Sequence, residues 1–136
     1  MDLGTSMVVA ASGMRAQSQR MRIIAENIAN ANSTSSVAGA DPYRRQIATM
    51  KSQFDRDLDA TMVQAGKPMQ DQSQFRTQYD PGNPAADKQG YIKLPNVDSL
   101  VEIMDMREAQ RSYEADLTVM DASKTMMSRT VDLLRR

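Results

Sequence analysis

Cysteine, histidine and tryptophan are all absent from this sequence of 136 residues. Without cysteine there are no disulfides or thiol nucleophiles. Without histidine the chain lacks the usual acid–base catalyst of neutral pH and a common zinc or copper ligand. Seventeen basic and seventeen acidic residues balance, so no net charge attracts nucleic acid or an anionic membrane. We therefore expect a protein that is not an enzyme, uses no cofactor or metal and binds no nucleic acid.

Long hydrophobic segments are also absent. The longest apolar run, near residues 7–11, is far shorter than the roughly 20 residues that a transmembrane helix requires. The opening residues lack the basic start and apolar stretch of a cleavable signal peptide. We expect no direct membrane span, and any export of this chain to proceed without signal cleavage.

Methionine supplies much of the apolar content, with twelve residues against two Phe and four Tyr. Its flexible thioether adapts to irregular packing, which suits a surface that meets inequivalent neighbours. Near the N-terminus, methionine or isoleucine recurs every seven residues, from Met7 to Ile28. A second set of positions with the same spacing, which begins at Leu3, is also apolar except at Gln17. This heptad pattern predicts a helix. The Asn/Ser-rich residues 30–36 end it. The expected interface residues of this seam are Leu3, Met7, Met14, Met21, Ile24 and Ile28.

A second heptad seam runs through the C-terminal part of the chain and predicts a helix over about residues 98–134. Asn96 or Asp98 can cap its start after Pro95, and only Gln110 and Lys124 interrupt the seam. The expected interface residues here are Ile103, Met106, Tyr113, Leu117, Met120, Met127, Val131 and Leu134.

The middle of the chain holds all five prolines and shows no sustained period. Residues 43–50 and 89–94 are candidate short strands, and residues 52–64 are candidates for a helical turn or two. The sequence thus predicts a mainly α fold: two long terminal helices forming a coiled-coil-like hairpin, joined by an irregular Gly/Pro-rich middle with a candidate short β-hairpin. The expected divisions are residues 1–34, 35–97 and 98–136.

The expected helix lengths carry a further implication. At 1.5 Å per residue the helices span about 45 and 55 Å. A compact chain of this size has a radius of gyration of only about 14 Å. Such helices form an elongated pair or are buried by neighbouring molecules, so we interpret both seams as assembly interfaces.

Two groups of aspartates suggest other functions. Asp55, Asp57 and Asp59 would share one face of a strand, as cation ligands do, but the chain lacks the Gly and Glu that a calcium loop places at its sixth and twelfth positions. A glycan-cleaving enzyme needs two carboxylates across a cleft. Its candidates are Asp71, Asp80 and Asp87, although no apolar wall accompanies them and turn formation explains their positions more simply.

Tyr43, Arg44 and Arg45 form a small basic and aromatic cluster. Such a cluster can bind phosphate or stack on a base. A solvated edge or an intersubunit salt bridge is the simpler interpretation of two arginines and one ring.

Residues 26–34, Glu-Asn-Ile-Ala-Asn-Ala-Asn-Ser-Thr, resemble the Asn-Ile-Ala-Asn motif of the bacterial flagellar axial proteins, the family of rod, hook and related subunits. Residues 42–45 and 79–97 resemble the proximal rod members of that family in particular. Residues 111–115 and 124–127 continue the likeness, which covers nearly the whole chain, whereas residues 35–41 match no pattern of the family.

The resemblance implies a structural subunit of the flagellar proximal rod in the periplasmic part of the basal body. It implies export by the flagellar type III apparatus and assembly into a helical tube that transmits torque and encloses the export channel. The implied partners are copies of the chain, other rod subunits, and the inner-membrane ring with its adaptor protein. The alternative is another helical secretion-apparatus or adaptor component, which would share the seams but not residues 79–97.

Overall fold

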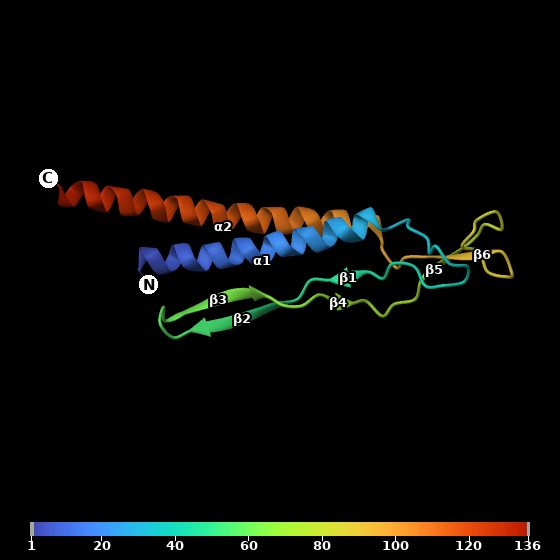
Figure 1. The fold of residues 1–136 in the computed structure, drawn as a ribbon. Helices are drawn as coiled ribbons and strands as arrows, with labels where there is room; N and C mark the ends of the chain where they lie inside the picture. The colour runs from blue at the N-terminus through green and yellow to red at the C-terminus, as the bar shows by residue number, and fades with distance from the viewer. Residues whose placement is uncertain (1, 136) are drawn as a thin grey trace. The chain divides into compact units, whose positions relative to one another are not determined.

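A computed structural model of the chain describes residues 2–135 and contains two helices and three separate pairs of short strands (Figure 1). The helices are α1 (Leu3–Ala29) and α2 (Ser99–Leu134). The strands are β1 (Gln46–Ile47), β2 (Met50–Asp55), β3 (Ala60–Ala65), β4 (Met69–Gln70), β5 (Arg76–Tyr79) and β6 (Tyr91–Leu94). The predicted pair of terminal helices with an irregular, partly β middle is therefore confirmed in broad terms.

Local side-chain chemistry explains where α2 begins and where α1 ends. The Asp98 carboxylate accepts the backbone N–H of Leu100 at 2.9 Å and so caps the start of α2, as predicted. At the end of α1 the Glu26 carbonyl accepts both the backbone N–H of Asn30 at 3.1 Å and the Asn30 side-chain amide at 2.8 Å. The Asn/Ser-rich stretch thus ends α1 as expected.

All three strand pairs are antiparallel, and each contains two strands. β1 pairs with β4, β2 pairs with β3 and β5 pairs with β6. The candidate strand at residues 89–94 is confirmed by β6, and the candidate at 43–50 contains β1 and the first residue of β2.

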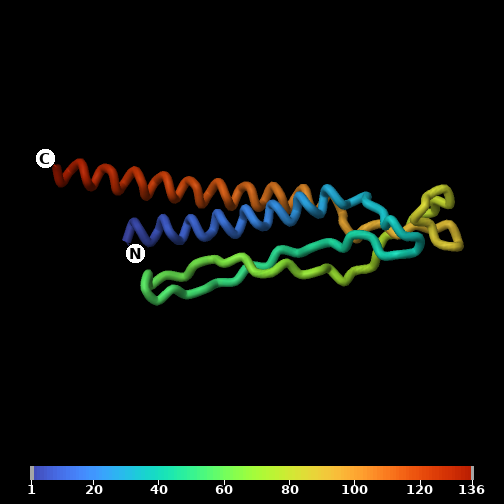
Figure 2. The backbone as a smooth tube through the Cα atoms, in the orientation of Figure 1, coloured from blue at the N-terminus to red at the C-terminus, as the bar shows by residue number. Residues whose placement is uncertain are grey.

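The expectation of helical turns in residues 52–64 is wrong. This segment lies in the β2–β3 hairpin, in which Met50 is opposite Ala65 and Asp55 is opposite Ala60 (Figure 2). The Asp55 side chain accepts the N–H groups of Asp57 and Leu58, and Asp59 adopts a left-handed φ of 46°. Aspartate tolerates this conformation better than most residues, so the Asp-rich turn reverses the chain before a helix can form.

Contacts divide the chain into two compact units. The first unit contains α1 up to Met21, residues Ala48–Lys67 and α2 from Arg107 onward. The second contains Arg22–Ile47 and Pro68–Met106. In the second unit the buried apolar residues include isoleucine and valine side chains, whereas the buried apolar residues described in the first unit are all alanines.

Candidate functional site

The side chain of Asn27, within the Asn-Ile-Ala-Asn motif, uses every hydrogen-bonding position it has. Its Nδ2 donates to the Gln46 carbonyl at 2.8 Å and to Glu102 Oε2 at 3.0 Å. Its Oδ1 accepts from the Tyr43 hydroxyl at 2.8 Å and from the Gln46 N–H at 3.0 Å. Asn27 is only 1 % exposed. Because all hydrogen-bonding positions of this buried amide are occupied, Asn27 specifically links α1 to residues 43–46 and to the start of α2.

Glu102, in the first turn of α2, is as deeply buried as Asn27 and is neutralised by Arg45. The Arg45 Nε donates to Glu102 Oε1 at 2.6 Å, and the same guanidinium lies 3.4 Å from Asp71 and 3.7 Å from Asp105. A carboxylate with an exposure of 1 % requires such a partner, because an unpaired buried charge is strongly unfavourable. Arg45 thus forms its salt bridge with a residue of the same chain.

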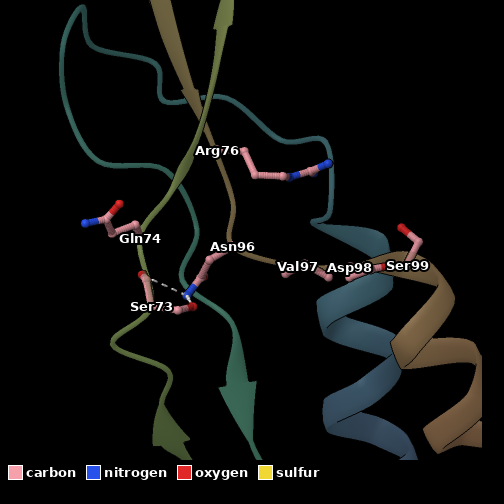
Figure 3. Close-up of a pocket in the computed structure, with 7 residues that line it drawn as sticks. All are labelled: Ser73, Gln74, Arg76, Asn96, Val97, Asp98 and Ser99. Carbon is pink, nitrogen blue, oxygen red and sulfur yellow. Dashed lines mark hydrogen bonds between the residues drawn. The ribbon is translucent and has the colours of Figure 1, made fainter.

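Asn96 completes the network between β6 and α2. Its Oδ1 accepts the Arg45 N–H at 2.8 Å, and its Nδ2 donates to the Asp71 carbonyl and to the Ser73 hydroxyl. Figure 3 shows Asn96 turned toward Ser73, joined by a dashed line, with α2 starting immediately after Asp98. Asn27, Arg45, Asn96 and Glu102 are hereafter the junction network.

Tyr43 donates a hydrogen bond to Asn27 of the junction network at neutral pH. Burial first, and then the carboxylates of Glu26 and Glu102, raise the pKa of Tyr43 above its ordinary value. Its hydroxyl therefore keeps the proton that it donates to Asn27.

In the first unit, contacts between α1 and α2 involve small and polar residues. A Cβ added at Gly13 would fall within 2.4 Å of the Asp116 carboxylate, so only glycine fits there without a shift of that side chain. Arg20 and Glu108 form an ion pair at 3.5 Å. The buried residues of this unit are Ala10, Ser12, Ala16, Ala60, Ala109 and Ser123.

The β2–β3 hairpin contacts the opposite side of α1, which Figure 1 shows between the hairpin and α2. The Ser12 hydroxyl accepts the Val63 N–H at 3.2 Å, and Gln19 donates to the Gly66 carbonyl at 3.4 Å. These helix side chains satisfy backbone groups along β3 and its end, so this edge of the hairpin is covered.

The expected interface residues fall into two groups. On α1, Ile24 is buried and the others are half-buried. On α2, the half-buried residues are Met106, Tyr113 and Met120. The exposed ones are Ile103, Leu117, Met127, Val131 and Leu134.

Two family models match the two ends of the chain. The model described as "Flagella basal body rod protein" matches residues 7–35, and "Flagellar basal body rod FlgEFG protein C-terminal" matches residues 88–133. The flagellar basal-body rod protein FlgC of Agrobacterium fabrum is 47 % identical over 133 residues, 98 % of this chain and 96 % of the relative. The chain belongs to the FlgC family of flagellar basal-body rod proteins.

More distant FlgC proteins match over similar lengths. The protein of Escherichia coli O6:H1 is 36 % identical over 92 % of each chain. That of Bacillus subtilis is 36 % identical over 94 % of this chain and 95 % of its own. As a FlgC family member, the chain is a structural rod subunit of the flagellar basal body, which confirms the resemblance seen in the motifs.

The FlgC-like segment 79–97 contains the last residue of β5, the loop that connects β5 to β6, β6 itself and the three residues that follow it. The rings of Tyr79 and Tyr91 meet edge to face with centroids 5.2 Å apart. Asp87 Oδ1 accepts the N–H groups of Gln89 and Tyr91, and Gly90 has a φ of +84°. The loop is thus shaped by turn chemistry and presents both rings on its surface.

The aspartates considered for catalysis act in turns and ion pairs. Backbone donors, Tyr91 foremost, hold the pKa of Asp87 below its ordinary value, and hydrogen bonds from Ser73 do the same for Asp71. A general acid requires a raised pKa instead. In residues 2–135 no group of three or more acidic side chains is placed to hold a metal ion.

The basic cluster is also engaged within the chain. The Arg44 guanidinium stacks 4.2 Å from the Phe75 ring centroid and donates to the carbonyls of Asp71 and Ser73. Together with the Arg45 pairing, these contacts leave the phosphate interpretation without support. Neither described helix carries an apolar stretch able to cross a bilayer.

Sequence reasoning missed the junction network and the face of α2 that meets α1. Glu102, Ala109, Asp116 and Ser123 recur every seven residues, one position before the predicted apolar seam. This repeat of small and polar residues is the sequence feature that could have indicated which face of α2 packs against α1. The residues next to Asn27 and Glu102 in the sequence do not indicate their hydrogen-bond partners, which lie 16 to 75 residues away.

Proposed function

We propose that this FlgC family member is a proximal rod subunit that polymerises through its two terminal helices into a helical tube, which transmits torque and encloses the export channel. Its helices act as a coiled-coil-like hairpin, residues 1–34 with 98–136. Residues 35–97 make the contacts specific to the proximal rod. The proposed partners beyond other rod subunits are the inner-membrane ring with its adaptor protein and the type III export apparatus.

The observation that carries this proposal is the size difference between buried and exposed side chains in the first unit. Every buried residue among those described in this unit is an alanine or a serine, while Leu117, Val131 and Leu134 are 42 %, 50 % and 82 % exposed. Burial of large aliphatic side chains stabilises by about 1.5–3 kcal/mol each, far more than burial of alanine. The side chains with most to gain from burial are therefore available to neighbouring subunits.

The pairing of α1 with α2 also leaves part of α2 beyond the start of α1. The two observed contacts join Gly13 to Asp116 and Arg20 to Glu108, so residue numbers across the antiparallel pair sum to about 129. Leu3 then lies opposite about residue 126, and the following two turns of α2 extend past it. A head-to-tail contact that does not close into a ring builds a helical filament, and such an extension suits it.

The test is Leu117→Asp in a strain that lacks its own copy of the gene. The carboxylate would be buried without a partner when subunits associate, so we expect loss of swimming and of rods in purified basal bodies, with soluble protein still present. Ala115→Asp is the matched control, since Ala115 is exposed on α2 outside the apolar seam. Met21→Asp tests the seam on α1 in the same way.

Normal motility of the Leu117→Asp strain would contradict the interface. Equal loss in the Ala115→Asp strain would contradict the assignment of the seam to one face. We also propose that the chain is not an enzyme, because its relatives are rod proteins and the pKa values of the candidate catalytic residues Asp71 and Asp87 are lowered. Turnover of peptidoglycan that Asp87→Asn abolishes would overturn this.

A further inference from the structure

Met126 and Met127 are adjacent on the part of α2 where the partner helix ends. They are 49 % and 41 % exposed, whereas Met120, two turns earlier on the same helix, is half-buried. The register of the helix pair explains the exposure of Met127, which shares a heptad position with Met120, because Leu3 lies opposite about residue 126. Met126 lies one heptad after Val119, and both side chains are 49 % exposed. The thioethers of Met126 and Met127 are therefore open to small reagents in solution.

The chain contains no cysteine, so methionine supplies its only sulfur. A hydroperoxide transfers one oxygen atom to a thioether: the sulfur loses two electrons and becomes a sulfoxide, and hydrogen peroxide leaves as water. The product is polar, and methionine sulfoxide reductases reverse it. A sulfoxide on Met127 within the apolar seam, or on Met126 directly beside it, places an unsatisfied acceptor where a flexible apolar side chain belongs.

We propose that Met126 and Met127 form a reversible oxidation site that prevents a subunit from joining the assembly while it is oxidised. The inference rests on the proposed function, because it requires this part of α2 to be covered by a neighbouring subunit. It adds a modification site and a class of reagent, hydroperoxides, that act on the subunit before incorporation.

The first measurement is the rate of oxidation of the purified full-length chain by hydrogen peroxide. Trypsin cleaves after Lys124 and Arg129, so residues 125–129 leave as one peptide that contains both methionines and no other. Residues 112–124 form the internal control peptide, with Met120 as its only methionine. We expect sulfoxide to form about fivefold faster in the first peptide. Equal rates would overturn the inference.

The second measurement compares substitutions in cells that lack the native gene. Met126→Gln with Met127→Gln imitates the polar sulfoxide and is expected to reduce the number of basal bodies about tenfold. Met126→Leu with Met127→Leu conserves volume and is expected to assemble normally. Under a pulse of hydrogen peroxide the leucine variant should assemble more new basal bodies than the wild type. Met69→Gln is the control for an exposed methionine elsewhere, since Met69 is 62 % exposed.

Normal assembly of the glutamine variant would overturn the oxidation site. So would equal peroxide sensitivity of the leucine variant and the wild type, because Met69 or Met104 would then be responsible. These results leave the proposed function intact as long as Leu117→Asp blocks assembly. If Leu117→Asp and the glutamine variant both assemble, the proposed interface itself is wrong.

Discussion

Asn27 and Gln46 exchange two hydrogen bonds, as residues on neighbouring antiparallel strands do. The Asn27 amide nitrogen donates to the Gln46 carbonyl at 2.8 Å, and the Gln46 N–H donates to Asn27 Oδ1 at 3.0 Å. The Asn27 side chain on α1 thereby makes the two hydrogen bonds that a neighbouring strand would make with the backbone of Gln46, the first residue of β1. The contact fixes where the chain leaves the helix and begins its β segments.

Asn27→Asp is expected to destabilise the chain by about 3 kcal/mol at pH 7. The new carboxylate can still accept from Tyr43 and Gln46, but its second oxygen would face the Gln46 carbonyl and Glu102, to which Asn27 donates. Urea unfolding followed by circular dichroism measures the change. Asn32→Asp is the control, because Asn32 is exposed. Equal stabilities for the two variants would show that the junction network contributes little.

Arg45→Met is expected to destabilise by about 3 kcal/mol, since it leaves the buried Glu102 carboxylate without its cation. Adding Glu102→Gln to this variant should restore part of the loss, because a neutral side chain needs no counter-charge. The comparison of both single variants with the double variant gives the coupling energy. Strictly additive effects would mean that the two side chains do not act as a pair.

Acid is expected to weaken the β5–β6 loop and the Asp71 turn. The folded pKa values of Asp87 and Asp71 lie below the ordinary 3.8, chiefly because of hydrogen bonds from Tyr91 and from Ser73 respectively. These carboxylates therefore stabilise the fold fully above the unfolded pKa, and their contribution is lost as the pH falls through the folded pKa. Unfolding measured between pH 7 and pH 2 should show a decline confined to the region below about pH 4.

Asp87→Asn provides the check on that decline. The asparagine oxygen can still accept from the backbone of Gln89 and Tyr91, but it does not titrate in this range. The variant should lose less stability on acidification than the wild type. An unchanged pH profile would show that Asp87 makes no part of the acid response.

Gly90→Ala is expected to destabilise the β5–β6 hairpin by about 1–2 kcal/mol. Gly90 has a φ of +84°, and a Cβ there would lie 2.9 Å from the Tyr79 ring and 3.2 Å from Pro81. Gly82→Ala is the matched control in the same loop, since the nearest atom to its added Cβ is 3.7 Å away. Thermal unfolding followed by tyrosine fluorescence, to which Tyr79 and Tyr91 contribute two of the four rings, measures the change. A Gly90→Ala variant as stable as Gly82→Ala would contradict the strain.

The sequence by itself determined the features that depend on near neighbours in the chain. Heptad periodicity predicted both helices, Asp98 capped α2 as expected, and residues 79–97 and 26–34 identified the family. Capping and periodicity involve residues a few positions apart, so a single sequence displays them. The Asp-rich turn of the β2–β3 hairpin was the local exception, because its left-handed residue is an aspartate and not a glycine.

Only the tertiary structure decided which side chains meet. The ion pair of Arg45 with Glu102 joins residues 57 positions apart, and Asn27 meets Glu102 over 75. The side of α2 that approaches α1 contains Ala109 and Asp116, because helices come closest where side chains are small, and Leu117 is left exposed as a result. Apolar periodicity shows that a helix has a face to bury, but packing in three dimensions decides whether the same chain or another one covers it.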